Sequence, residues 1–298
     1  MTEQAFKNNV IIMRNGALGD FVLTLPVFQS IQDHYPNHTL YAIGNPTNCK
    51  LLTKSWNIID IESRDWLGLY SDGNVPRSVE NLLKRTTLML IYGAPSGNFF
   101  KNVTRFLGEK ALFFDPHPPV NYSEHITNYL LSPLNDILKI PITNSSPTCH
   151  FSTKISDKID TVAHIGSSSP IKNWPLKNFV KWAETLHKKG IKVNLILGPV
   201  EKEIGILESI DVPIIYPANL KELAHSLMSA KLFVGNDSGP GHLAAALGTA
   251  TITLFGPTNP LIWAPNHPQN KVLSAPEKIM DSISVDSVVF ATLKRLNN

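Results

Sequence analysis

Short continuous apolar runs alternate with amphipathic segments along the whole chain. In the first half, the runs predict strands at residues 10–13, 39–43, 58–61, 87–92 and 111–114, and the amphipathic segments predict helices at 20–34 and 99–107. In the second half, they predict strands at 161–165, 191–197, 212–216, 231–234 and a run that begins at 249, with helices at 176–189, from 201, at 220–229 and at 285–296. This alternation is typical of mostly parallel sheets covered by helices, so the pattern predicts an α/β fold.

The alternation is interrupted once, at residues 140–148, where Pro, Asn and Ser cluster. We therefore expect two doubly wound, Rossmann-like domains, residues 1–150 and 151–298. The last predicted helix, 285–296, could pack back across the joint onto the first domain. Residues 116–122 contain three prolines and are expected to form an irregular surface loop.

Composition narrows the class of protein. The hydrophobic fraction of 43% is that of a globular chain, and the net charge of +3 with scattered Lys and Arg argues against nucleic acid as a partner. The two cysteines, Cys49 and Cys149, form neither a disulfide framework nor a metal-ligand pattern. No apolar run is long enough to span a bilayer and the N-terminus lacks a signal-peptide core, so we expect a soluble, cytoplasmic protein.

The most informative stretch, residues 233–248, reads as a buried strand, a glycine-rich turn and a short helix. Asp237 or Ser238 can cap this helix. Gly239 and Gly241 have no Cβ, so a ligand can approach the backbone where free N–H groups point outward. The stretch therefore predicts an anion site for the phosphates of a nucleotide, and a tight turn that binds nothing is the alternative.

A second candidate turn joins the first strand to the first helix at residues 14–20. Gly16 and Gly19 lack the spacing of the dinucleotide fingerprint, which disfavours an NAD enzyme. Asp20 stands at the start of the helix, where its anionic form is stabilised. It is either an N-cap that satisfies backbone donors or a catalytic base.

A third candidate is the serine-rich loop that follows the strand at 161–165. Ser167 and Ser168 supply hydroxyl donors, and Lys172 is a flexible cation suited to phosphate. Trp174 is expected to anchor this loop by burying its ring. Glu201, after another strand, could accept hydrogen bonds from a ribose or base, or could simply begin a helix.

Three segments together resemble the hallmark segments of glycosyltransferase family 9, the ADP-heptose:lipopolysaccharide heptosyltransferases. They are residues 14–26 (RNGALGDFVLTLP), 164–175 (HIGSSSPIKNWP) and 234–257 (VGNDSGPGHLAAALGTATITLFGP), in an order and spacing that fit nearly the whole chain. The resemblance implies a GT-B fold, in which two Rossmann-like domains face an interdomain cleft. It also implies inverting, metal-independent transfer of a heptose from ADP-heptose to a lipopolysaccharide core acceptor.

The resemblance also implies residue roles. Asp20 matches the catalytic aspartate of the family, and Lys172 matches the lysine that contacts the phosphate and sugar of the donor. Further donor-binding candidates are Ser167, Ser168, Glu201, Asp237, Ser238, Gly239 and His242. For the acceptor side we expect Arg14, Asn15 and Gly16. No cofactor and no metal are expected, since the sequence contains no D-x-D pair or His/Asp cluster to hold a metal.

Other functions remain open on the sequence alone. A GT-B transferase of another nucleotide sugar would act on a different glycan or on a protein, and a non-catalytic homologue would only bind the nucleotide sugar. A sugar epimerase on the same fold lacks a second acid/base candidate. A lipid-linked acceptor would bring the protein to the inner membrane leaflet as a peripheral contact, although no basic amphipathic helix is evident.

Overall fold

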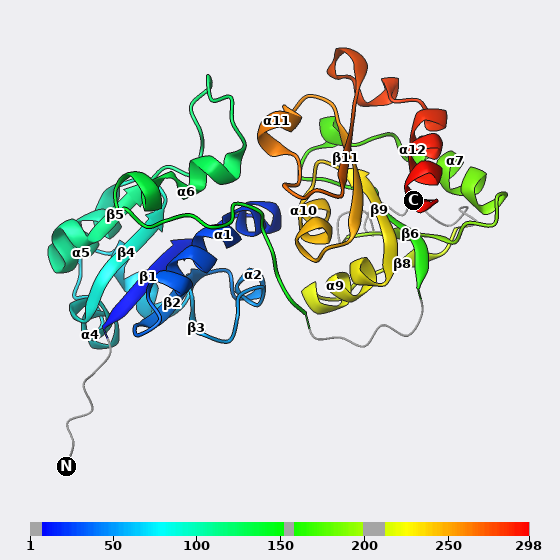
Figure 1. The fold of residues 1–298 in the computed structure, drawn as a ribbon. Coiled ribbons are helices and arrows are strands. Elements are labelled where there is room, and N and C mark those ends of the chain that lie inside the picture. Colours follow the sequence, from blue (N-terminus) through cyan, green and yellow to red (C-terminus); the bar gives the residue numbers. More distant parts are fainter. Residues whose placement is uncertain (1–7, 152–157, 199–211, 298) are drawn as a thin grey trace. The chain divides into compact units, whose positions relative to one another are not determined.

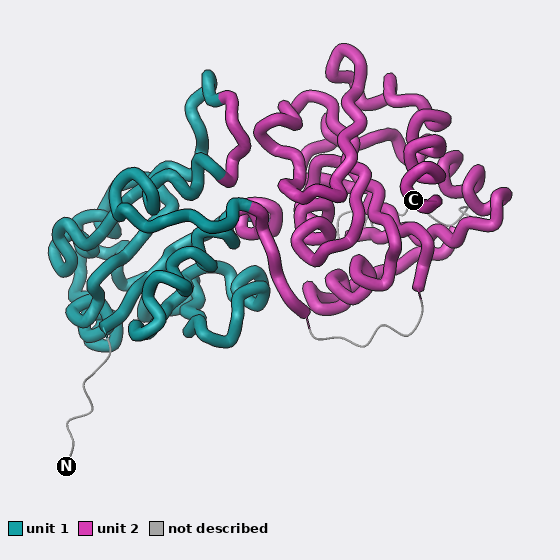
Figure 2. Tube along the Cα trace, viewed as in Figure 1, with its two compact units in different colours: residues 1–17, 24–122, 128–145 teal, residues 18–23, 123–127, 146–298 magenta. Residues whose placement is uncertain are grey.

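The computed structural model describes residues 8–151, 158–198 and 212–297. The chain divides into two compact units (Figure 2): unit 1 comprises residues 1–17, 24–122 and 128–145, and unit 2 comprises 18–23, 123–127 and 146–298. The main change from one unit to the other lies within the proline- and serine-rich interval 140–148. Two short stretches, 18–23 and 123–127, group with unit 2, so the division is less simple than one boundary near residue 150.

Unit 1 is built on one parallel sheet of five strands in the order β3-β2-β1-β4-β5. β2 and β3 are added on one side of β1, and β4 and β5 on the other, so the strand order reverses between β1 and β4. Ligands of such sheets bind beyond the carboxyl ends of the strands at this switch point. The elements of this half are β1 (Asn9–Arg14), α1 (Leu18–His34), β2 (Thr39–Gly44), α2 (Pro46–Cys49), β3 (Trp56–Asp60), α3 (Arg64–Leu67), η1 (Gly68–Tyr70), α4 (Arg77–Lys84), β4 (Thr86–Tyr92), α5 (Gly97–Leu107), η2 (Gly108–Lys110), β5 (Ala111–Phe114) and α6 (Ile126–Asp136).

Unit 2 contains a parallel sheet of six strands in the order β11-β10-β9-β6-β7-β8 (Figure 1). Counted from β6, this is the strand order of a dinucleotide-binding Rossmann domain, with its switch point between β6 and β9. The elements are β6 (Ile159–His164), η3 (Pro170–Lys172), α7 (Leu176–His187), β7 (Val193–Ile196), β8 (Ile214–Ile215), α9 (Leu220–Met228), β9 (Ala230–Asn236), α10 (Gly239–Ala246), β10 (Ala250–Phe255), α11 (Pro260–Trp263), β11 (Asn270–Ser274), η4 (Pro276–Lys278), η5 (Met280–Ser282) and α12 (Val285–Leu296).

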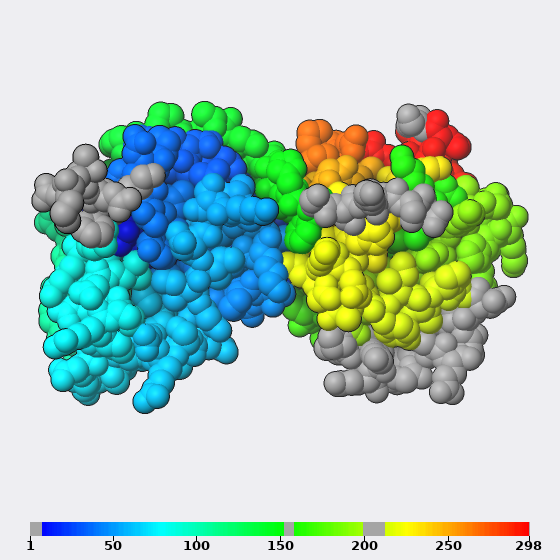
Figure 3. Space-filling view, turned by 90° about the horizontal axis from the view of Figure 1, so that it is seen from below, coloured from blue at the N-terminus to red at the C-terminus, as the bar shows by residue number. Residues whose placement is uncertain are grey.

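Helices cover both faces of the unit 2 sheet because the buried strands alternate their apolar side chains between the two faces. On one face, alternate strand residues such as Leu232 and Val234 share a core with the apolar sides of α7 and α12. On the other face, Phe233 lies against α10. A Cβ atom on Gly241 of that helix would be 3.4 Å from the ring of Phe233. Residues 212–240, which include α9 and are yellow in Figure 3, form a large part of the surface of this unit in that view.

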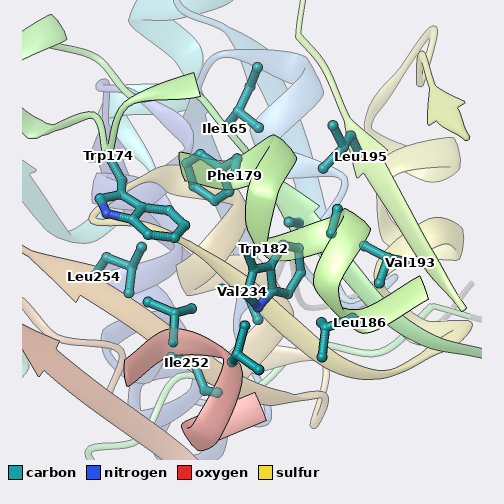
Figure 4. Packing of buried hydrophobic residues seen from close by; sticks show 14 of the residues in the cluster. Ile165, Trp174, Phe179, Trp182, Leu186, Val193, Leu195, Val234, Ile252 and Leu254 are labelled. Atoms are coloured by element: carbon teal, nitrogen blue, oxygen red, sulfur yellow. The ribbon is translucent and has the colours of Figure 1, made fainter. Parts of the chain in front are cut away.

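Large aromatic side chains fill the core beneath α7 (Figure 4). Trp174, Phe179 and Trp182 are each at most 1% exposed, and the rings of Trp174 and Phe179 meet edge to face at 4.9 Å. Helix α12 packs on this core within unit 2, where Trp182 Nε1 donates to Thr292 Oγ1 at 3.1 Å. Its apolar face completes the C-terminal core against α7, and the expected packing of helix 285–296 back on the N-terminal domain stays a prediction.

Candidate functional site

The turn between β9 and α10 carries a buried carboxylate. The Asp237 side chain is 8% exposed, and its Oδ2 accepts hydrogen bonds from Lys172 Nζ at 3.0 Å and from Thr258 Oγ1 at 2.9 Å. Lys172 comes from the loop after β6, and Thr258 from the loop after β10. Three loops at the carboxyl ends of neighbouring strands therefore converge on one carboxylate, at the switch point of the sheet.

The environment of Asp237 favours its ionised form. Burial alone would raise the pKa of this carboxyl group, but the neighbouring His242 and Lys172 more than offset that effect and hold the pKa below its usual value of 3.8. His242 Nε2 lies 3.8 Å from Oδ1, which is beyond hydrogen-bond distance. The carboxylate thus bonds Lys172 from the loop after β6 and lies beside His242 of α10.

The loop after β6 is shaped by its own hydrogen bonds. Ser167 Oγ donates to Asn173 Oδ1 at 2.6 Å and contacts the Ser169 carbonyl at 2.8 Å, while Ser168 is exposed. The predicted donor serines thus differ, because one braces the loop and the other faces solvent. Trp174 anchors the end of the loop as expected, since its Nε1 donates to the Ile283 carbonyl at 2.9 Å.

Sequence reasoning missed Asn236, which fixes the distance between two of the converging loops. Its side chain is fully buried, its Nδ2 donates to the Ile165 carbonyl at 2.8 Å, and its Oδ1 accepts from the Trp174 N–H at 2.9 Å. Both partners belong to the segment that carries Lys172. The only sequence signal was a polar residue at the end of a buried strand, which is also typical of an ordinary turn.

Ser238 occupies the N-cap position of α10, but its hydroxyl does not cap the helix. The residue is 8% exposed, and its Oγ is buried without a hydrogen-bond partner. The prediction that Asp237 or Ser238 caps the helix is therefore wrong for both side chains, since Asp237 bonds Lys172 and Thr258 instead. A buried hydroxyl without a partner is destabilising, so Ser238 is a candidate to bond a ligand.

The glycines of the turn serve close packing rather than open access. A Cβ on Gly239 would lie 3.1 Å from both the backbone nitrogen of Gly19 and the Cβ of Leu18, and a Cβ on Gly19 would lie 3.3 Å from His242 Cδ2. The first turn of α1, which groups with unit 2, therefore packs against the first turn of α10. Two helix N-termini, each with partial positive charge, thus meet beside Ser238 and favour an anion there.

Asp20 is the third residue of α1, which begins at Leu18. The prediction that it is an N-cap is therefore wrong, and its carboxylate belongs to the first turn, where the helix dipole stabilises a negative charge. Gly19 packs on Gly239 where the two helix ends meet, and Asp20 is the next residue along α1.

Comparison with known proteins assigns the chain to a family. The model of glycosyltransferase family 9 (heptosyltransferase) matches residues 129–288, more than half of the chain. The chain belongs to glycosyltransferase family 9. It is therefore a glycosyltransferase, and the cluster of Lys172, Asp237 and Ser238 lies within the matched residues.

A relative in sequence and two solved structures are similar to this family 9 enzyme over most of its length. The lipopolysaccharide core heptosyltransferase OpsX of Haemophilus influenzae is 26% identical over 297 residues, which cover 91% of this chain and 85% of OpsX. The structure of E. coli heptosyltransferase WaaC with ADP has a TM-score of 0.73 at 18% identity and covers 96% of this chain and 99% of WaaC. A family 9 glycosyltransferase from Veillonella parvula DSM 2008 has a TM-score of 0.77 at 17% identity, over 100% and 99% of the two chains. The fold is GT-B, with two Rossmann-like domains.

The acceptor-side candidates of this family 9 enzyme lie at the end of β1 and directly after it in unit 1. Arg14 is 6% exposed, and its Nε donates to Thr24 Oγ1 at 3.1 Å. Asn15 and Gly16 are exposed, and Gly16 adopts a φ of 149°, a conformation that favours glycine. The structure therefore divides the three candidates into one buried cation and two exposed loop residues.

The remaining candidates concern Glu201, metals and membranes. Glu201 lies outside the described residues. Within residues 8–151, 158–198 and 212–297, His, Cys, Asp and Glu side chains form no group of three or more suited to a metal ion. In the same ranges, no helix has both the length and the apolar character needed to cross a membrane.

Proposed function

We propose that this glycosyltransferase transfers a heptose from ADP-heptose to a lipopolysaccharide core acceptor, with inversion at the anomeric carbon and without a metal ion. The observation that carries the proposal is the Lys172–Asp237 ion pair beside the unpartnered hydroxyl of Ser238, at the switch point of a Rossmann sheet. A nucleoside diphosphate suits such a site. The names of the relatives OpsX and WaaC support heptose as the sugar and lipopolysaccharide core as the acceptor.

The donor diphosphate would bind to groups that the fold already holds in place. Lys172 is 23% exposed at its side chain, so its ammonium group can bond a phosphate oxygen while Asp237 retains it. The Ser238 hydroxyl would donate to a second oxygen, and the N-terminal end of α10 would stabilise the negative charge. Each charge-assisted bond contributes about 1.5–3 kcal/mol, and such bonds strengthen as charge grows on the departing ADP.

Asp20 is our candidate for the general base. The acceptor hydroxyl oxygen would attack the anomeric carbon from the face opposite ADP, the bond from that carbon to the phosphate oxygen would break with its electron pair going to ADP, and the hydroxyl proton would pass to the Asp20 carboxylate. A single displacement of this kind inverts the configuration. General-base help contributes a factor of about 10² to 10⁴ in rate. Arg14, Asn15 and Gly16 precede α1 in the chain and are our candidates for the acceptor side.

In this proposal, Lys172 and the N-terminal end of α10 neutralise the charge of the diphosphate, so the reaction needs no cofactor. The lipid-linked acceptor would be reached at the inner membrane leaflet by peripheral contact. The other donor-side candidates, Ser167, Ser168, Gly239 and His242, surround the same turn and loop. Of these, Ser167 is held in place by its hydrogen bond to Asn173, and His242 Nε2 lies 3.8 Å from Asp237 Oδ1.

A titration with nucleotides, followed by product analysis, tests the proposal. ADP and ADP-heptose should raise the melting temperature in buffer with EDTA, because only a ligand that prefers the native state stabilises it. Incubation with ADP-heptose and deacylated lipopolysaccharide core should yield one product with inverted anomeric configuration by NMR. Stabilisation by UDP or GDP instead of ADP would assign a different donor, and loss of transfer in EDTA would refute the metal-free scheme.

A further inference from the structure

The carboxyl edge of the unit 1 sheet carries a continuous row of aromatic side chains beside Arg14. The strand register places Arg14 of β1 opposite Tyr92 of β4, and Tyr92 opposite Phe114 of β5. The rings of Tyr92 and Phe114 meet at 5.8 Å with an interplanar angle of 79°. Because these residues end their strands, the row follows the edge where ligands of parallel sheets bind.

Two further tyrosines extend the row away from the sheet. Tyr129 of α6 lies 4.8 Å from Phe114 between ring centroids, and Tyr122 of the proline-rich loop lies 5.3 Å from Tyr129. The Tyr129 hydroxyl donates to the carbonyl of His117 in that loop at 3.2 Å. Tyr92 is 5% exposed and belongs to the core, whereas Tyr122 and Tyr129 are only partly buried. The outer end of the row therefore presents aromatic surface to solvent.

Polar groups stand next to this aromatic surface. Asp115 Oδ1 accepts from the His117 N–H at 2.9 Å and lies 3.0 Å from His117 Nδ1. These bonds from His117 hold the pKa of Asp115 below its usual value. Burial raises the pKa of Tyr129, and the Asp115 carboxylate adds to that effect.

We propose that Tyr122, Tyr129, Asp115 and His117 form a subsite for a saccharide ring of the acceptor. The inference rests on the proposed function, in which the acceptor is a glycan. A sugar ring has one face of C–H groups, which packs on the negative face of an aromatic ring, and hydroxyl groups, which donate to a carboxylate. The outer end of the row offers both kinds of partner in one place.

The chemistry of the subsite argues against two other occupants. A phosphate group would be repelled by the Asp115 carboxylate. A lipid tail would place the Asp115 carboxylate in an apolar environment, which is unfavourable for a charged group. β5 is two strand spacings from β1, about 10 Å, so the subsite lies beyond direct reach of Arg14. It would therefore hold a sugar next to the one whose hydroxyl is attacked.

Steady-state kinetics of transfer test the subsite, with deacylated lipopolysaccharide core as the probe. Tyr122→Ala should raise the KM for the saccharide about 3- to 10-fold, in line with the strength of an aromatic contact, and leave kcat and the KM for ADP-heptose within about twofold. Tyr122→Phe keeps the ring and should restore the wild-type KM. Tyr70→Ala is a matched control that should leave the KM unchanged. Tyr70, at the end of η1 in the same unit, is also partly exposed, and its ring stacks on that of Phe99 with 4.7 Å between centroids.

Direct binding separates failure of the subsite from failure of the proposed function. Saturation-transfer NMR should detect the saccharide on the wild-type protein, and Tyr122→Ala should weaken that signal. Binding without any transfer would refute the heptosyltransferase proposal and leave the subsite standing. Normal transfer with an unchanged saccharide KM in a folded Tyr122→Ala protein would refute the subsite alone, as would absence of saccharide binding to the wild-type protein.

Discussion

Neutralising Asp237 tests whether the ion pair with Lys172 organises the candidate donor site. Asp237→Asn keeps the shape of the side chain and an acceptor for Thr258, but it removes the charge. At a separation of 3.0 Å, the Coulomb attraction to Lys172 is about 1.4 kcal/mol in water and about 5.5 kcal/mol at an effective dielectric constant of 20. Because Lys172 is 23% exposed and both groups lose solvation, we expect a net coupling energy of about 1–2 kcal/mol.

The assay is a double-mutant cycle with Asp237→Asn, Lys172→Met and the double variant, measured by calorimetry at several pH values. The pKa of Asp237 is lowered in the folded protein, so the unfolded chain binds a proton more readily and stability rises with pH in this window. The contribution should be complete above about pH 5 and decline as the pH falls through 3.8 toward the folded pKa. The melting-temperature difference between wild type and Asp237→Asn should shrink over the same interval.

A second ion pair serves as the control. Lys231 Nζ lies 2.7 Å from Asp160 Oδ1, but the Lys231 side chain is 55% exposed and the Asp160 side chain 23%. The expected coupling energy is therefore only about 0.2–1 kcal/mol. Lys172→Met should also raise the Kd for ADP about 10- to 100-fold, whereas Lys231→Met should leave it unchanged. A coupling energy between Lys172 and Asp237 no larger than that of the control pair would refute the reasoning.

Four further predictions follow from the site and the core. Asn236→Ala leaves the Ile165 carbonyl and the Trp174 N–H without the hydrogen bonds that Asn236 makes to them, so the free energy of unfolding should fall by about 2–4 kcal/mol. A melting-temperature loss under about 2 °C would contradict this bridging role. Ser238→Ala removes a hydroxyl without a partner, so the ligand-free protein should be as stable as wild type while the Kd for ADP rises about 3- to 10-fold; an unchanged Kd would remove Ser238 from the donor site. Asp20→Asn should lower kcat about 10²- to 10⁴-fold and leave ADP affinity unchanged by calorimetric titration, and normal turnover would exclude Asp20 as the base. Burial raises the pKa of Cys49 and of Cys149 to about 12, so a thiol reagent at pH 8 should modify neither until the protein is denatured; fast labelling of the native protein would contradict the buried placement.

The strands and the amphipathic helices were largely predictable, since their apolar residues occur at regular intervals. β5 and α12 begin and end at the predicted residues, 111–114 and 285–296. β3 begins two residues earlier than predicted, at Trp56, because the Trp56 ring packs on Phe28 at 5.0 Å and no local pattern reveals that contact.

Among the elements that escaped prediction, α6 and β11 did so for identifiable reasons. Helix α6 contains Pro133, which predicts a helix end, yet the helix continues and the Pro133 carbonyl accepts from Ile137 N–H at 3.2 Å. Strand β11 (Asn270–Ser274) is half-exposed, pairs only with β10 and lacks a strong apolar run. Tertiary pairing, rather than local propensity, forms this strand.

The residues of the candidate site were easier to predict from the sequence than the hydrogen bonds and ion pairs that join them. Lys172, Asp237 and Ser238 are conspicuous because polar groups follow buried strands. Their roles relative to one another depend on β6 and β9 being neighbours, which the sequence does not specify. Thr258 and Asn236 were missed, since a threonine or asparagine after a strand is also common in turns that bind nothing.

The asparagine bridge has a consequence for how the protein folds during synthesis. Asn236 and the Ile165 carbonyl are 71 residues apart, and closing a flexible loop of that length costs about 3.8 kcal/mol of chain entropy. Contacts of such long range form late, after local helices and hairpin-scale contacts. The candidate donor site can therefore form only once β9 has left the ribosome and inserted beside β6. Protection by ADP would then report completion of the C-terminal sheet, and a nascent chain that ends before residue 236 would have no affinity to protect it.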